Sequence, residues 1–412
     1  LKIDISKISK LTLENISGIE LLSFPAEIAR LSLWLIDHQM NVALGSLFGE
    51  YFAKLPLKEQ PFILHGNALA VDWGNLAPSR TRASYILGNP PFVAKQDQGP
   101  NQKTDMHHVF GDLKGAGELD YVSAWYAKAA DFIQNTDIHC AFVSTNSITQ
   151  GEQAGILWPF LLRKGILINF AHRTFRWTND APGRAAVHCV IIGFSVQKSD
   201  KPRLWDYDDP GGNPHLVEAR NINPYLVDAD NVVVLPRRKT LAKVPAARFG
   251  SMPNDNGFLL FDNDAKKEEF LLEEPTAEKF VKPLLSAKEY LNGEMRYCLW
   301  LKNASAQDMR SMPRLMRRIE AVRVYRDLSK REATRRLART PYLFGEDRQP
   351  DTDFVLIPLT SSENRKYIPM SFFSPDYIVN NTCAFVPNAT PYHFGVLHSL
   401  LHMPSIRTVC GR

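Results

Sequence analysis

Apolar segments of strand length alternate with amphipathic segments of helix length from the N-terminus to about residue 197. This alternation is typical of a mostly parallel sheet that is covered by helices. Ligands of such sheets bind at the carboxyl ends of the strands, so the polar residues that follow each strand are candidate site residues. The expected strands end within residues 19–20, 62–64, 85–87, 141–143, 166–168 and 187–194, and helical spacing predicts helices over 26–37 and 121–132.

At 412 residues the chain is longer than one ordinary domain. Residues 198–214 are rich in Lys, Asp, Pro and Gly, and the alternation of strands and helices decays after them. We therefore expect an α/β domain over residues 1–200 and an α+β domain over residues 201–412.

Asn89-Pro90-Pro91-Phe92 directly follows the expected strand that ends at Gly88. A residue before proline avoids the α region, so this backbone is extended and stiff, and its carbonyl groups have fixed directions. The Asn89 side-chain oxygen and the Pro90 carbonyl can each accept a hydrogen bond from an exocyclic amino group, which directs its lone pair toward an electrophilic methyl group. Phe92 can stack on a base that has left the duplex. The motif predicts amine methylation, and an ordinary proline turn is the alternative.

Two further strand ends carry residues suited to a nucleoside. Glu20 can accept hydrogen bonds from ribose hydroxyl groups, although a surface carboxylate is the simpler interpretation of one acid. Asn67, within His65-Gly66-Asn67-Ala68-Leu69, can bind the adenine amino group of a cofactor, and an Asx turn is its alternative.

Cations gather in three places. The segment from His172 to Trp177 mixes Arg173 and Arg176 with aromatic residues, which suits phosphate and base contacts as well as a packed surface. Ser361-Ser362-Glu363-Asn364-Arg365-Lys366 supplies groups that can read base edges, or forms an ordinary hairpin loop. The third place is the segment of residues 310–339, in which bases far outnumber the three acids. This excess favours phosphate binding over a solvated helical face. The bases are Arg310, Arg314, Arg317, Arg318, Arg323, Arg326, Lys330, Arg331, Arg335, Arg336 and Arg339.

Composition excludes several other classes of protein. The five cysteines form no CxxC pair, so neither a metal site nor a disulfide framework is expected, and the chain is expected to be cytoplasmic. No apolar run approaches the roughly 20 residues of a membrane span. The formal net charge of +5 is mild, but arginine is concentrated in the C-terminal half.

These motifs, in this order, resemble the MmeI-like DNA adenine N6-methyltransferases. The resemblance extends almost to the C-terminus and rests on Gly18-Ile19-Glu20, residues 28–34, Asp37-His38-Gln39, residues 65–69, 88–93, 120–122, 125–126, 144–153, 170–175 and 365–369.

The resemblance implies a class I S-adenosylmethionine-dependent (Rossmann-like) sheet and a target-recognition domain that binds double-stranded DNA. It implies a catalytic motif of Asn89, Pro90, Pro91 and Phe92. Cofactor-binding residues would be Glu20, Asn67, Ala68 and Asn89, and DNA-binding residues would be Arg173, Arg317, Arg318, Glu363, Asn364, Arg365 and Lys366.

One feature of the family is missing from this sequence. The glycine-rich loop that approaches the methionine part of the cofactor should precede Glu20 by some thirty residues or more, and no Gly-x-Gly occurs there. We therefore expect the sheet to be incomplete at its N-terminus, with that loop and a nuclease domain upstream on the parent polypeptide. A DNA-binding module without catalysis, and methylation of another nucleic acid such as RNA, are the alternatives.

Overall fold

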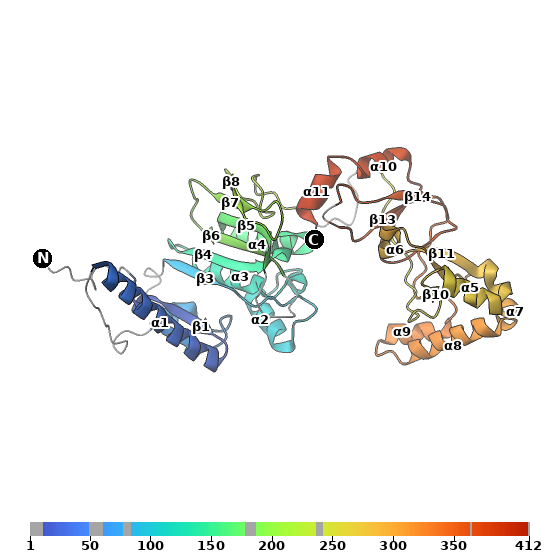
Figure 1. The fold of residues 1–412 in the computed structure, drawn as a ribbon, viewed down its shortest axis with the longest axis horizontal. Coiled ribbons are helices and arrows are strands. Elements are labelled where there is room, and N and C mark those ends of the chain that lie inside the picture. The colour runs from blue at the N-terminus through green and yellow to red at the C-terminus, as the bar shows by residue number, and fades with distance from the viewer. Residues whose placement is uncertain are drawn as a thin grey trace. The chain divides into compact units, whose positions relative to one another are not determined.

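The chain forms two compact units. The computed structural model describes residues 11–48, 61–76, 84–177, 187–235, 242–362 and 365–410. The described residues up to 235 form most of the first unit, and those from 242 to 408 form the second (Figure 1). Each unit has hydrophobic clusters of its own.

The described residues of the first unit form two sheets. In one, β1 (Ser17–Glu20) pairs in parallel with β2 (Phe62–His65). The other has six strands in the order β3 (Tyr85–Gly88), β4 (His139–Thr145), β6 (Val187–Ser195), β5 (Leu167–Trp177), β7 (Arg203–Asp206) and β8 (His215–Glu218). Every strand expected from the sequence overlaps an observed one, so the α/β fold is confirmed.

The six-stranded sheet is mixed, so the expectation of a mostly parallel sheet was wrong here. Among its described strand pairs only β3–β4 and β5–β7 are parallel, whereas β6 runs antiparallel to both β4 and β5. Residues 178–186 alone separate β5 from β6, and a parallel crossover needs about a dozen residues or more.

Helices and sheet of the first unit share one core. The helices are α1 (Ser23–Phe48), α2 (Pro100–Phe110), α3 (Ser123–Phe132) and α4 (Gly151–Arg163), with single turns η2 (Leu13–Asn15), η3 (Trp73–Asn75), η5 (Ala116–Glu118) and η6 (Asn146–Thr149). The buried Phe142 ring of β4 contacts Tyr126 of α3 edge-on at 5.2 Å and Phe194 of β6 at 5.6 Å. Ile19 of β1 and Leu69, after β2, pack against the same cluster.

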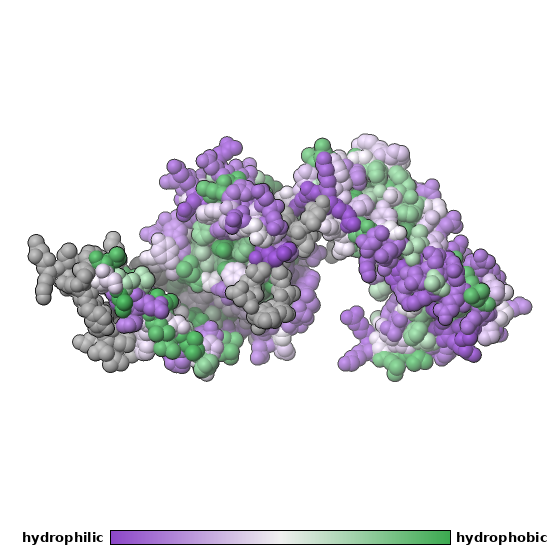
Figure 2. Space-filling model, in the orientation of Figure 1, coloured by the Kyte–Doolittle hydropathy of each residue, from purple (hydrophilic) through white to green (hydrophobic). Residues whose placement is uncertain are grey.

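Helix α1 exposes apolar side chains (Figure 2). Leu31 and Leu35 are about half exposed, and Met40 is more than half exposed. Neither α1 nor any other helix in the described part of the chain is long and apolar enough to cross a bilayer.

Gly193 of β6 makes room for the Phe170 ring of β5, because a Cβ at residue 193 would lie 2.1 Å from Phe170 Cε1. We expect Gly193→Ala to destabilise the protein by about 1–3 kcal/mol, the usual cost of overpacking. Urea unfolding of the variant would measure it. Gly117→Ala is the control, since its Cβ would meet nothing within 4 Å, and equal unfolding midpoints for both variants would contradict the steric argument.

The second unit combines two four-stranded sheets with helices, which confirms the α+β prediction. The sheets have the orders β10 (Leu260–Phe261), β12 (Arg296–Leu299), β11 (Val281–Leu285), β15 (Ile378–Val379), and β14 (Ser371–Phe373), β13 (Phe354–Pro358), β16 (Cys383–Pro387), β9 (Arg248–Phe249). The helical elements are α5 (Asp264–Glu273), η7 (Pro275–Phe280), α6 (Ala287–Asn292), α7 (Ala306–Arg310), α8 (Pro313–Asp327), α9 (Glu332–Arg336), η8 (Leu337–Arg339), α10 (Pro391–Leu397) and α11 (His402–Val409).

The units divide later in the chain than the boundary drawn at residue 200. Strand β7 lies inside the segment 198–214 that was expected to separate the domains, and it pairs in parallel with β5. Its Leu204 is fully buried in the core of the first unit. The turn-forming residues on both sides of β7 make this short strand hard to recognise in the sequence. We place the boundary of the units between residues 235 and 242.

Candidate functional site

The Asn89-Pro90-Pro91-Phe92 segment begins where β3 ends, at the carboxyl end of the strand. Pro90 is buried, Phe92 packs half-buried against the core, and Asn89 is exposed. Within the described parts of the chain, no group hydrogen-bonds to the Asn89 side chain or to the Pro90 carbonyl. Both acceptors therefore have unused hydrogen-bonding capacity within the described fold.

A buried carboxylate fixes the loop that continues from Phe92. Asp120 is 7% exposed, and its Oδ1 accepts a hydrogen bond from the Lys95 N–H at 3.2 Å. Its Oδ2 accepts one from the Ser147 hydroxyl at 2.5 Å, just after β4. The Tyr121 N–H donates to the Val93 carbonyl at 2.9 Å. The loop is thus held by the side chain of Asp120 and the backbone of Tyr121.

Glu20 and Asn67 follow neighbouring parallel strands. Glu20 pairs with His65 in the ladder, and the Gly66 N–H donates to the Glu20 carbonyl at 2.8 Å. One carboxylate oxygen of Glu20 accepts from the Leu22 N–H at 3.2 Å, which leaves the other for a ligand.

Asn67 and Ala68 form a turn after β2. Asn67 Oδ1 accepts from the Leu69 N–H at 2.9 Å, so the Asx turn that was the alternative interpretation is present. The Ala68 carbonyl accepts from Trp73 Nε1 at 2.9 Å, while no described residue accepts the Ala68 N–H. An open carboxylate oxygen, an amide and an open N–H at two adjacent strand ends fit an adenosine group.

Arg173 is engaged within the first unit. Its guanidinium forms an ion pair with Asp206, and its Nε donates to the Leu226 carbonyl at 2.7 Å. An additional phosphate contact would compete with these bonds. The structure therefore gives Arg173 bonds inside the fold, and its contact with DNA stays a prediction.

Trp205 and Tyr207 form an aromatic cluster with His172, beside Arg173, and neither was among the site residues expected from the sequence. The His172 imidazole stacks on Trp205 with ring centroids 4.6 Å apart, and its Nδ1 lies 2.9 Å from the Tyr207 hydroxyl. Burial lowers the pKa of His172, which favours the neutral ring. Trp205 lies on β7 and Tyr207 directly follows it, so the two aromatic residues alternate with buried Leu204, and that alternation was the signal available in the sequence.

Two of the arginines of α8 point into the second unit. Arg318 donates from Nη1 to the Phe258 carbonyl at 2.7 Å, and its guanidinium lies 4.6 Å from the centroid of the Phe261 ring. Arg326 is fully buried. Its guanidinium donates to five main-chain carbonyls, those of Pro253, Asn254, Leu337, Thr340 and Leu343. The Arg318 guanidinium is therefore bound within its own unit and is not a free phosphate contact, and Arg326 is not part of the basic surface.

The remaining bases from Arg310 to Arg339 differ in their partners. Arg314, Arg323 and Arg336 form ion pairs with acids, and Arg335 donates to two main-chain carbonyls. Five are exposed and have no side-chain partner among the described residues: Arg310, Arg317, Lys330, Arg331 and Arg339. Figure 2 shows mainly hydrophilic side chains over α8 and α9, interrupted by hydrophobic ones. We call these five residues the free basic set.

The segment with Arg365 and Lys366 connects the antiparallel strands β13 and β14, so the hairpin interpretation describes its backbone. Arg365 Nη2 donates to the Leu291 carbonyl at 3.2 Å, whereas Lys366 is exposed. Glu363 and Asn364 lie outside the described residues.

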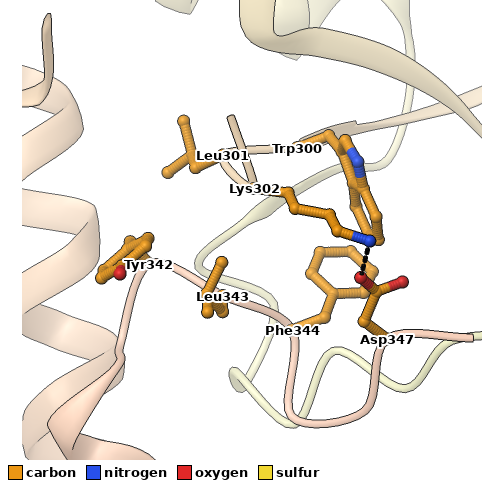
Figure 3. A pocket seen from close by; sticks show the side chains of 7 residues that line it. All are labelled: Trp300, Leu301, Lys302, Tyr342, Leu343, Phe344 and Asp347. Atoms are coloured by element: carbon orange, nitrogen blue, oxygen red, sulfur yellow. Dashed lines mark ion pairs between the residues drawn. The ribbon is translucent and has the colours of Figure 1, made fainter. Parts of the chain in front are cut away.

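A pocket in the second unit is lined by Trp300, Leu301, Lys302, Tyr342, Leu343, Phe344 and Asp347 (Figure 3). The Lys302 ammonium and the Asp347 carboxylate form an ion pair at 2.6 Å beside the Trp300 and Phe344 rings. The pocket therefore offers no unpaired charge for recognition. Among the described residues, no group of three or more His, Cys, Asp or Glu side chains is placed to hold a metal ion.

The chain is similar to known proteins over both of its units. A family model for the DNA-methyltransferase domain of MmeI matches residues 1–206, and one for the MmeI target recognition domain matches residues 228–412. DNA methyltransferase A of Bacillus subtilis (strain 168) is 37% identical over 407 residues, which is 98% of this chain and 46% of that protein.

A solved structure of the type IIL restriction-modification enzyme MmeI in complex with DNA matches with a TM-score of 0.92 and 48% identity, over 99% of this chain and 55% of that one. The chain thus spans about half the length of these relatives. The family expected from the motifs is confirmed: the chain belongs to the MmeI family, with a methyltransferase domain followed by a target recognition domain.

Proposed function

We propose that the protein containing this chain transfers a methyl group from S-adenosylmethionine to the N6 amino group of adenine in double-stranded DNA. The observation that carries the proposal is the pair of open acceptors, the Asn89 amide oxygen and the Pro90 carbonyl, on a proline-stiffened segment at the end of β3. S-adenosylmethionine supplies an electrophilic methyl group when it is bound.

The chain's own residues would prepare the amino group for attack. Hydrogen bonds from the amino group to Asn89 and Pro90 hold its lone pair out of conjugation with the ring, so no strong base is required before attack. As the N–C bond forms, the C–S bond of the donor breaks, which leaves S-adenosylhomocysteine, and the methylated amine then loses one proton to solvent. Asp120 and Tyr121 keep the loop in place during the reaction, since both bond to its backbone. Phe92 would stack on the extruded base, at roughly 1–3 kcal/mol per base.

The cofactor would lie at the carboxyl ends of β1 and β2. Glu20 would accept hydrogen bonds from the ribose hydroxyl groups, and Asn67 with the Ala68 N–H would bind the adenine ring.

The reaction can be tested with labelled S-adenosylmethionine and duplex DNA, followed by digestion and chromatography of the nucleosides. We expect N6-methyladenine as the product. Methylated cytosine alone would refute the target base, and a failure to label DNA would refute the reaction.

DNA would be positioned by the free basic set and read by other residues of the second unit. Arg317→Ala should weaken binding to all duplexes alike and lower the slope of log K against log salt by about one, because a phosphate contact is the same at every base step. Gel-shift titrations of two unrelated duplexes over a salt series would measure both effects.

Arg323→Ala is the matched control on the same helix, because its charge already faces Glu320 at 3.6 Å. A smaller change is expected for it. If Arg317→Ala leaves the salt slope unchanged, or weakens one duplex alone, Arg317 does not contact phosphate.

Base reading is proposed for the segment of Glu363, Asn364, Arg365 and Lys366. Bidentate groups there would discriminate bases by roughly 1–3 kcal/mol at a single position of the site. The parent polypeptide is further proposed to carry a nuclease domain upstream.

A further inference from the structure

The Asn67 side chain is held in one orientation. Its Oδ1 accepts from the Leu69 N–H at 2.9 Å, and its Nδ2 lies 3.0 Å from both carboxylate oxygens of Asp105. A flipped amide would place an N–H against the Leu69 N–H and an oxygen against a carboxylate, so the assignment of oxygen and nitrogen is fixed.

The amide retains bonding capacity after these contacts. The two oxygens of one carboxylate lie in nearly the same direction from Asn67 Nδ2, whereas the two amide hydrogens point in different directions. One hydrogen is therefore shared between both oxygens, and the second remains available to a ligand. One lone pair of Oδ1 also remains. A donor and an acceptor on one amide complement the amino group and a ring nitrogen of adenine.

Asp105 lies on α2 and is itself held by Tyr121, whose hydroxyl donates to Oδ2 at 2.5 Å. Burial, followed by this hydrogen bond, raises the pKa of Tyr121, so the hydroxyl remains a donor. The Tyr121 N–H also bonds to Val93, next to the Asn89-Pro90-Pro91-Phe92 motif. Asp105 therefore joins the turn after β2 to the residue that supports the motif's loop.

Lys128 secures the same turn by different bonds. Its ammonium donates to the carbonyls of Leu69 and Val71, both at 2.6 Å. The turn's backbone is thus fixed by hydrogen bonds that do not include Asp105, although the nearby Asp105 carboxylate favours the charged ammonium. The hydrogen bond that Asp105 alone supplies is the one that directs the Asn67 amide.

We propose that Asp105, which bonds to Asn67 and Tyr121, is a positioning residue that aims the Asn67 amide at the adenine ring of the cofactor. This rests on the proposed function and adds to it a group that would not touch the cofactor.

The test exchanges the two groups in the full-length protein. Asp105→Asn leaves one acceptor for two donors, and Asn67→Asp sets two carboxylates against each other. The double variant restores the pair in reverse, because an amide at residue 105 can donate to a carboxylate at residue 67 and still accept from Tyr121. Calorimetry with S-adenosylhomocysteine measures binding, and thermal unfolding of the cofactor-free variants checks the fold.

Each single substitution should raise the Kd for S-adenosylhomocysteine about tenfold. The double variant should bind more tightly than Asn67→Asp alone. Asp105→Asn should also raise KM for S-adenosylmethionine with kcat nearly unchanged, a split that a merely structural defect would not give. Asp112→Asn, an exposed carboxylate just beyond α2, is the control and should bind as the wild type does.

The possible outcomes separate this proposal from the reaction itself. Wild-type affinity in Asp105→Asn, or losses that simply add in the double variant, would overturn the role of Asp105 while the methyltransferase stands. Wild-type protein that binds no S-adenosylhomocysteine would refute the proposed cofactor, and the role of Asp105 with it. Should Asp105→Asn fail to fold, Tyr121→Phe decides, with about a threefold higher Kd expected and an unchanged Kd counting against the proposal.

Discussion

Replacing Asn89 by alanine should lower DNA methylation by about two to three orders of magnitude, the usual loss when a hydrogen-bond partner of the transition state is removed. The side chain is exposed at the end of β3 and bonds to no described residue, so its removal should leave the fold intact. The loop behind it keeps its bonds to Asp120 and Tyr121. Single-turnover labelling of duplex DNA would measure the rate.

Two further variants make the result specific to the acceptor. Asn89→Asp keeps a side-chain oxygen and should lose less activity than alanine does. Asn101→Ala removes another exposed asparagine, on α2, and should methylate at the wild-type rate. Undiminished labelling by Asn89→Ala would show that the amide takes no part in the chemistry.

Replacing Arg326 by methionine should destabilise the second unit by about 3–5 kcal/mol, the scale of removing one partner from a buried charged network. Methionine fills similar space but donates no hydrogen bond, so five main-chain carbonyls lose a partner. Each unsatisfied buried acceptor alone costs about 1–3 kcal/mol. Denaturant unfolding followed by tryptophan fluorescence would report the loss.

Arg323→Met is the matched control, because this exposed arginine of α8 has only a weak pair with Glu320. Its change should stay within about 0.5 kcal/mol. Similar losses for both variants would mean that Arg326 contributes no more than an ordinary surface arginine.

The sequence predicted the strands and the position of the Asn89-Pro90-Pro91-Phe92 loop because both are local features. Apolar runs bounded by polar residues located the strands, and the proline pair defined the loop after β3. The direction of the strands was not local, since β6 inserts between β4 and β5. The Asp105 contact with Asn67 also joins residues that are 38 positions apart, and no pattern in one sequence reveals such a pair.

Helical spacing separates the inward-facing arginines of α8 from the exposed ones. Arg317 and Arg318 are adjacent in sequence, but neighbours on a helix face different directions. Leu315, Ile319 and Val322 form the buried stripe of α8, and Arg326 continues it at helical spacing. The periodicity thus indicated that Arg326 points inward, whereas the charge count alone suggested a surface.

The separate hydrophobic clusters of the two units have an evolutionary consequence. Every buried member of the first unit's cluster lies before residue 236, and the three clusters of the second unit share none of them, although Val409 at the end of α11 packs against the first unit's cluster. Each unit is also encoded almost entirely by one continuous stretch of the gene. A crossover between codons 235 and 242 would therefore exchange almost the whole target recognition domain and keep every buried member of the first unit's cluster, so one recombination event can bring in a new recognition domain.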